Sequence, residues 1–298
     1  MNKVIVNLAA GIGSLLVPSV VVAGEPVRVL ASLPITFGLG SILLQGAEAQ
    51  VVRAAPANLP ATRQLSFFTG RGAGSLEKAA GNADAVIALR SLWPDDPLYP
   101  MARRSNIRIV EVDAARPVDG VLPGIALSSA GRNPLEERPW LSTNNLGRMA
   151  DVIAADLVRL SPSDAEQIAS NLADIKQRLL TLSATSESRL AELDNLSVVS
   201  LSPGFEYLTS SLNLDVIAVP GPSPSDPDDE ASLDSLKLAI EDNDVRLVLT
   251  DRPVDEAVAN AVKAADARLI VLDELPEDPL VALSETTEQI IDGLSGHR

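Results

Sequence analysis

Residues 161–193 read SPSDAEQIASNLADIKQRLLTLSATSESRLAEL, and this stretch decides the architecture that the sequence predicts. Its first four residues are typical of a helix start, with Pro162 in the first turn. Residues 165–193 contain no glycine or proline, and leucine or isoleucine recurs on one helical face, at positions 168, 172, 175, 179, 182 and 190. About 30 residues at 1.5 Å per residue would form a helix about 45 Å long. Such a helix could bridge two lobes; the alternative is an ordinary surface helix or a short coiled coil.

Short β-branched runs alternate with helical patterns on both sides of this stretch. Strands are predicted at residues 27–33, 50–55, 85–89 and 107–113, and again at 197–201, 215–219, 245–250 and 268–272. Helices are predicted at 35–47, 75–82 and 144–160, with a glycine-rich loop before the second of them. We therefore expect an α/β fold of two lobes, each a parallel sheet covered by helices, bridged by a long rigid helix. The expected divisions are a signal peptide (1–24), an N-terminal lobe (25–141), a bridging segment (142–194) and a C-terminal lobe (195–298).

Composition excludes many chemistries. The chain of 298 residues has no cysteine and one histidine, His297, and a net charge of −16. The body of the protein therefore has no disulfide, cysteine nucleophile, histidine-containing triad or multi-histidine metal site. We expect no enzymatic activity, because no motif for paired carboxylates or a Ser-Lys pair stands out. Nucleic acid is not an expected partner of so acidic a chain. The acidity is concentrated in residues 141–298, with 29 acidic and 11 basic side chains, and this asymmetry favours two lobes.

The N-terminal segment has the form of a cleaved secretory signal. Lys3 precedes an apolar run over residues 4–22, and small residues follow at Ala23 and Gly24. Pro18 and the shortness of the run disfavour the alternative, a membrane anchor. No cysteine follows the run, so the mature protein would not be a lipoprotein. We expect it outside the cytoplasm, as a monomer.

Three local motifs, at residues 140–150 (WLSTNNLGRMA), 202–208 (SPGFEYL) and 271–273 (VLD), resemble the periplasmic solute-binding proteins of zinc, manganese and iron ABC importers. Residues 140–150 (WLSTNNLGRMA) resemble the family segment in which a metal-binding histidine precedes Trp-Leu-Asp-Pro and the bridging helix. Residues 202–208 (SPGFEYL), with the predicted strand after them, resemble the histidine loop of the second lobe. Residues 271–273 (VLD) are similar to the strand end that supplies a carboxylate ligand. The resemblance extends over nearly the whole mature chain in order and spacing, and it implies an ABC permease and its ATPase as partners.

The departures from the family pattern concern the metal ligands. Arg138 stands where the resemblance implies a histidine, and Ser202 where it implies a histidine or glutamate. Residues 51–75 contain no histidine for the first lobe, which leaves Asp273 as the one expected ligand position that keeps a ligand type. An arginine cannot be deprotonated at relevant pH and repels a divalent cation. The sequence therefore predicts that zinc does not bind in the family's usual way.

Aromatic and arginine side chains gather where chain segments leave the predicted strands. The ends of parallel strands are where open sheets bind ligands, so these residues predict an aromatic and arginine-lined interlobe cleft. The alternative is that the rings seal contacts between helices and sheets. The candidate ligand-binding residues are Phe67, Phe68, Arg71, Trp93, Arg138, Trp140, Ser202, Phe205 and Tyr207. The expected cargo is a metal chelate of the siderophore kind, whose chelator supplies the ligands of the metal.

Two other functions stay open at this point. A bare manganese, iron or zinc ion could bind through carboxylates, for which Asp251, Asp273, Glu206 and Glu274 are the candidates, because oxygen ligands suit harder cations. An accessory or adhesin-like protein could keep the fold without any ligand, since fold alone does not confer function.

Overall fold

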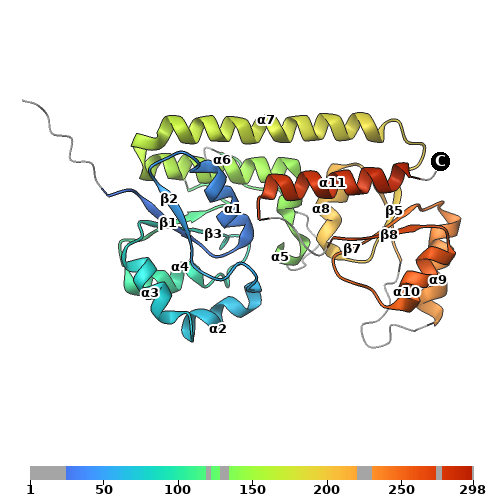
Figure 1. Ribbon diagram of the computed structural model, residues 1–298, viewed down its shortest axis with the longest axis horizontal. Helices are drawn as coiled ribbons and strands as arrows, with labels where there is room; N and C mark the ends of the chain where they lie inside the picture. Colours follow the sequence, from blue (N-terminus) through green and yellow to red (C-terminus); the bar gives the residue numbers. More distant parts are fainter. Residues whose placement is uncertain (1–24, 119–121, 128–133, 220–229, 273–276, 297–298) are drawn as a thin grey trace, which may run out of the picture.

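The computed structural model describes residues 25–118, 122–127, 134–219, 230–272 and 277–296. Within these ranges the chain forms two lobes side by side, joined along one side by a long helix (Figure 1). Each lobe contains one sheet of four parallel strands. The predicted α/β architecture is therefore confirmed.

The two lobes repeat one topology. The first sheet has the order β2-β1-β3-β4 and the second β6-β5-β7-β8, so in each the chain starts at an inner strand, moves to one edge and then crosses to the other side. The elements of the first lobe are β1 (Arg28–Ala31), α1 (Pro34–Leu43), β2 (Gln50–Arg53), α2 (Gln64–Thr69), α3 (Ala73–Gly81), β3 (Ala85–Ala88), α4 (Leu98–Ser105) and β4 (Val110–Asp113). Those of the second are β5 (Ser197–Ser200), α8 (Glu206–Ser211), β6 (Asp215–Ile217), α9 (Glu230–Asp242), β7 (Leu247–Thr250), α10 (Glu256–Ala264) and β8 (Arg268–Val271).

Four further helices connect or cover the lobes. They are α5 (Pro134–Glu137), α6 (Thr143–Leu160), α7 (Ala165–Leu190) and α11 (Pro279–Ser295). Single 3₁₀ turns lie at Ala61–Arg63, Pro139–Leu141, Pro162–Asp164 and Pro203–Phe205. No helix among the described residues is both long and apolar enough to cross a membrane.

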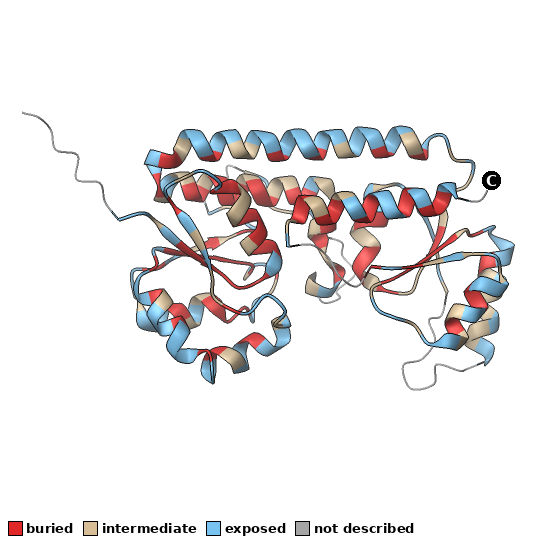
Figure 2. Ribbon diagram, in the orientation of Figure 1, coloured by how far each residue is buried: buried red, intermediate tan, exposed pale blue. Residues whose placement is uncertain are grey.

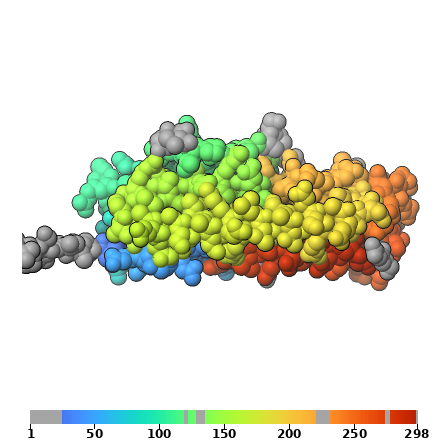
Figure 3. Space-filling view, turned by 90° about the horizontal axis from the view of Figure 1, so that it is seen from above, coloured from blue at the N-terminus to red at the C-terminus, as the bar shows by residue number. Residues whose placement is uncertain are grey.

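Helix α7 is the predicted bridge. Its 26 residues span about 39 Å at 1.5 Å per residue, and it runs along the whole upper side of both lobes, as the view from above also shows (Figures 1 and 3). Ile168, Ile175, Leu179 and Leu190 are buried, on the face turned towards the lobes, while the outer face is exposed (Figure 2). The helix packs mainly on α6 and α11.

Both faces of each sheet are buried, which explains the uninterrupted apolar strands. In β1, Val29 and Ala31 point to the main core, which also contains residues of α6, α7 and α11, and Leu30 points to a second core with α2, α3 and α4. In β7, Leu247 and Leu249 face the main core, and Val248 faces a third core with α9 and α10. Successive strand residues point to opposite faces, so helices must cover both.

The prediction of a glycine-rich loop before residue 75 is wrong for part of that segment. Residues 64–69 form α2, and the ring of Phe68 is fully buried in the second core. Gln64 lies one turn earlier and is buried too, with its amide nitrogen donating to the carbonyl of Ser32 at 3.3 Å. Burial of this helix face outweighs the weak helix propensity of the serine, the threonine and the two phenylalanines among its six residues.

Candidate functional site

A cavity of about 570 Å³ lies between the two lobes. Residues 33–35 and 57–61, which follow β1 and β2, line it from the first lobe, and Glu277, Pro279 and Ala282 from the start of α11. Leu135, Arg138, Trp140 and Leu141 close it from the connecting segment. The cavity thus lies beyond the carboxyl ends of two parallel strands, where open α/β sheets place their ligands.

Arg138, Ser202 and Asp251 meet beside this cavity although they are far apart in sequence. The Ser202 hydroxyl donates to Asp251 Oδ1 at 2.6 Å, and the Asp251 amide donates back to Ser202 Oγ at 3.0 Å. The Arg138 guanidinium lies 3.6 Å from Asp251 Oδ2. Ser202 follows β5 and Asp251 follows β7, so the ends of two neighbouring strands place them together.

The backbone of Arg138 has an unusual conformation. Its φ of 49° and ψ of 62° lie in the left-handed helical region. A residue with a Cβ adopts this conformation at a cost of about 1–3 kcal/mol. Pro139 follows at once and disfavours the right-handed helical region for the residue before it. The Arg138 carbonyl then accepts the amide of Leu141 at 2.9 Å, which closes the 3₁₀ turn containing Trp140.

The carboxylate of Asp251 is ionised, and two arginines balance its negative charge. Burial raises its pKa, but the Ser202 hydroxyl and the guanidinium groups of Arg252 and Arg138 outweigh burial and hold the pKa below its ordinary value. Arg252 Nε donates to Oδ1 at 3.2 Å. Two arginines therefore supply the positive charge that a bound cation would otherwise bring.

The described residues contain no group of three or more histidine, cysteine, aspartate or glutamate side chains close enough to hold a metal ion. Asp273, Glu274 and His297 lie outside these residues. Glu206 lines a neighbouring cavity of about 500 Å³, together with Ser202, at the ends of β5 and β6.

Most of the candidate aromatic rings lie away from this cavity. Phe68 and Phe205 are fully buried in the cores and do not border the cavity between the lobes. Trp93 and Tyr207 are half-buried away from it, with Trp93 packed on the main core. Trp140 is the one aromatic residue among those that line the cavity. These rings follow strand ends, as the sequence indicates, but most turn inward because the helices after the strands need apolar anchors.

Phe67 and Arg71 form a separate pair on the outside of the first lobe. The Arg71 guanidinium is exposed and lies 5.5 Å from the centre of the Phe67 ring. A Cβ at Gly72 would fall within 2.3 Å of this ring, so the pair packs against the backbone before α3. Neither residue lines the cavity.

Sequence reasoning missed the contribution of α11 to the site. Asp278 caps this helix by accepting the amides of Leu280 at 2.8 Å and Val281 at 3.1 Å, and Pro279 occupies the first turn. Aspartate followed by proline is a recognisable helix start, so Asp278 and Pro279 in the sequence could have predicted where α11 begins. The position of this start against the first lobe is a tertiary property, and it brings Glu277 to the cavity wall.

Comparison with known proteins identifies the family. The family model described as "Zinc-uptake complex component A periplasmic" (ZnuA) matches residues 75–292, well over half of the chain. The chain belongs to this family. Its relatives are periplasmic solute-binding components of metal-type ABC transporters, and they are transport components without enzymatic activity.

Solved structures of such proteins share the fold. The crystal structure of ZnuA has a TM-score of 0.65 at 19% identity and covers 91% of this chain and 100% of its own. The solute-binding protein FpvC from Pseudomonas aeruginosa in complex with Ni²⁺ has a TM-score of 0.66 at 18% identity, covering 92% and 98%. A mutant of the Mn-bound periplasmic metal binding protein from Candidatus Liberibacter asiaticus has 0.66 at 15%, covering 90% and 99%. No curated protein sequence matches the chain.

Proposed function

We propose that this member of the ZnuA family captures a metal chelate, rather than a bare ion, in the cavity between its lobes, and delivers it to an ABC permease and its ATPase. The observation that carries the proposal is the ion pair of Arg138 and Asp251, 3.6 Å apart at the edge of this cavity. The permanently charged guanidinium of Arg138 stands where the family resemblance implies a histidine, whose nitrogen lone pair would bind a metal.

Electrostatics oppose a free divalent cation here. A guanidinium stays charged at any relevant pH, so Arg138 repels a cation that approaches Asp251. Removing Arg138 from Asp251 to admit a metal would break a partly buried pair. A chelate avoids this conflict, because its own donor atoms surround the metal and present an organic, frequently anionic surface.

The cavity fits an organic ligand with an anionic group. Its volume of about 570 Å³ lies within the range of small-molecule sites and far exceeds that of an ion. Leucine, proline and the Trp140 ring supply apolar walls. Arg138 lines the cavity, and its buried Nη1 has no hydrogen-bond partner among the described residues. A small shift of the guanidinium on binding would let it donate to a carboxylate or catecholate oxygen.

The remaining expectations complete the proposal. The mature protein would begin after a signal peptide of residues 1–24 and act in the periplasm as a monomer, with iron as one candidate metal. Its lobes would comprise residues 25–141 and 195–298, with 142–194 as the bridge. Arg138 and Trp140 would contact the chelate, and Ser202 and Asp251 would position Arg138.

Titration calorimetry tests the proposal, with ferric chelates of catecholate and hydroxamate type compared with free Zn²⁺, Mn²⁺, Ni²⁺ and Fe²⁺. We expect heat from at least one chelate and none from the free ions. Arg138→Ala should weaken chelate binding about 10- to 100-fold, as expected for a lost charged hydrogen bond. Arg71→Ala is the matched control, because Arg71 lies outside the cavity, and it should bind like the unaltered protein.

Two outcomes would overturn the proposal in different directions. Tight binding of a free metal that is lost on Asp251→Ala or Asp273→Ala would establish a carboxylate site for a bare ion. No binding of any chelate or ion, by a protein with a normal melting transition, would indicate an accessory protein without a ligand.

A further inference from the structure

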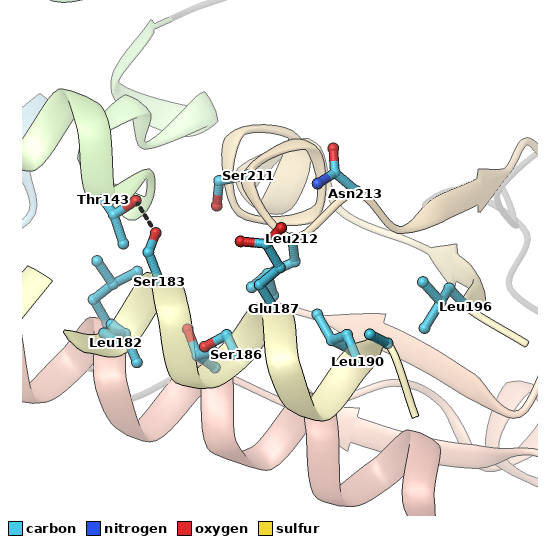
Figure 4. Close-up of a pocket in the computed structure, with 13 residues that line it drawn as sticks. Thr143, Leu182, Ser183, Ser186, Glu187, Leu190, Leu196, Ser211, Leu212 and Asn213 are labelled. Carbon is cyan, nitrogen blue, oxygen red and sulfur yellow. Dashed lines mark hydrogen bonds between the residues drawn. The ribbon is translucent and has the colours of Figure 1, made fainter. Parts of the chain in front are cut away.

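A second pocket lies where α7 passes the second lobe. It has a volume of about 280 Å³ and shares no lining residue with the interlobe cavity. Residues of α7 form one wall, Ser211, Leu212 and Asn213 at the end of α8 form the opposite wall, and Thr143 closes one end (Figure 4). The pocket is therefore lined by parts of four helices, with α6 and α11 contributing besides α7 and α8, and by the loop after α8.

Hydroxyl groups with unused hydrogen-bonding capacity line the pocket. Ser186 and Thr287 are only 3% and 2% exposed, and neither side-chain hydroxyl makes a hydrogen bond to another residue of the described chain. Figure 4 places Ser186 on the α7 wall. Buried polar groups are normally satisfied, so hydroxyls that open onto a cavity are ready to bind an occupant.

One charge governs the pocket. Glu187 is the only ionisable residue among the described residues that line it; it is exposed, and Figure 4 shows its side chain extending from α7 towards α8. Its carboxylate forms no ion pair with any part of the chain that the structure describes. No lysine or arginine lines the pocket, so an anion would be repelled, and a single carboxylate is too few ligands for a metal ion.

The rest of the lining is aliphatic. Five leucines take part, namely Leu182, Leu190, Leu196, Leu212 and Leu283. The volume corresponds to about nine water molecules at liquid density, which limits an occupant to a short chain. Apolar walls with one carboxylate and several hydroxyls complement an aliphatic group that carries an ammonium.

We propose that this pocket binds a small aliphatic ammonium compound, with its nitrogen at Glu187 and its chain against the leucines. Two of the three serine hydroxyls that line the pocket, those of Ser183, Ser186 and Ser211, would accept the other two ammonium hydrogens. Because the lining comes from α6, α7, α8 and α11, an occupant would brace the bridging helix against the second lobe. This inference is independent of the nature of the cargo in the interlobe cavity.

Calorimetry with three probes of matched size tests the proposal on the full mature chain. We expect n-butylammonium to bind, n-butanol to bind at least tenfold more weakly, and butyrate not to bind. Glu187→Gln should weaken n-butylammonium at least tenfold, and Ser186→Leu, which fills the pocket, should abolish its binding. Glu166→Gln, at an exposed position on the same helix, is the matched control.

The proposal fails if n-butylammonium produces no heat, if n-butanol binds equally well, or if Glu187→Gln leaves the affinity unchanged. A melting curve of each variant separates a lost site from a misfolded protein. Arg138→Ala, in the interlobe cavity, should leave n-butylammonium binding intact, so a failure of the chelate proposal is distinguishable from a failure of this one.

Discussion

Gly38 lies where α1 of the first lobe meets the segment that leads into α11 of the second. A Cβ at this position would fall 2.3 Å from the carbonyl oxygen of Glu277 and 2.7 Å from Pro279 Cδ. Real Cβ atoms do not approach backbone oxygens so closely, so one lobe must shift to admit a methyl group. A single missing side chain thus sets the distance between the two lobes at this point.

Gly38→Ala should therefore destabilise the protein by about 1–3 kcal/mol, the usual cost of forcing atoms into a packed contact. Urea unfolding measures this. Gly74→Ala is the matched control, because Gly74 lies in α3 with no neighbouring atom within 4 Å of the added Cβ, and alanine there should stabilise by up to about 1 kcal/mol. Equal stabilities for the two variants would contradict the tight lobe contact.

At the scale of the elements, Asp164 fastens the turn between α6 and α7 to the first lobe. It is 6% exposed, and its carboxylate accepts the amides of Glu48 at 2.9 Å and Ala49 at 3.0 Å and the hydroxyl of Ser161 at 2.7 Å. Burial raises its pKa, but these three hydrogen bonds outweigh burial and hold the pKa below the ordinary 3.8. The start of the bridging helix is therefore anchored to the loop before β2.

This anchor predicts a specific pH dependence. Because the pKa is lower in the folded state, the carboxylate adds stability above about pH 3.8, its unfolded value, and this contribution is lost as the pH falls through the folded pKa. Asp164→Asn should cost about 1–3 kcal/mol at pH 7 and flatten the loss of stability below pH 4. Urea unfolding between pH 2.5 and 7 measures both, with the exposed Asp174→Asn as control. If the stability of Asp164→Asn fell below pH 4 as steeply as that of the unaltered protein, the Asp164 carboxylate would not anchor the helix.

At the scale of the whole molecule, α7 is not the only link between the lobes. An ion pair between Arg53 and Glu277, here called the clasp, also joins them. Arg53, at the end of β2, lies 3.0 Å from Glu277 of the second lobe, and its guanidinium covers the ring of Phe37 at 3.9 Å. The side chain of Arg53 is 18% exposed and that of Glu277 is 54% exposed, so water screens the arginine end of the pair less than the carboxylate end. Glu277 also lines the interlobe cavity, which places the clasp at the cavity wall.

Arg53→Ala should therefore allow the lobes to separate. The chain has no cysteine, so spin labels at Glu77→Cys and Glu256→Cys, on exposed helices of the two lobes, report their distance by pulsed electron resonance without a background label. We expect Arg53→Ala to add a longer distance to the distribution. The exposed Arg63→Ala serves as control. An unchanged distribution would mean that the bridging helix alone holds the lobes.

The sequence by itself determined the α/β class, the order of the strands along the chain and the long helix, because these follow from local periodicity and from the absence of glycine and proline in residues 165–193. It also pointed to Arg138, Ser202 and Asp251, which the fold brings together. Tertiary structure alone decided which aromatic rings border the cavity. Phe68 and Phe205 turned into the cores, and Glu277 arrived from a distant helix, because contacts between remote segments depend on packing that no local pattern records.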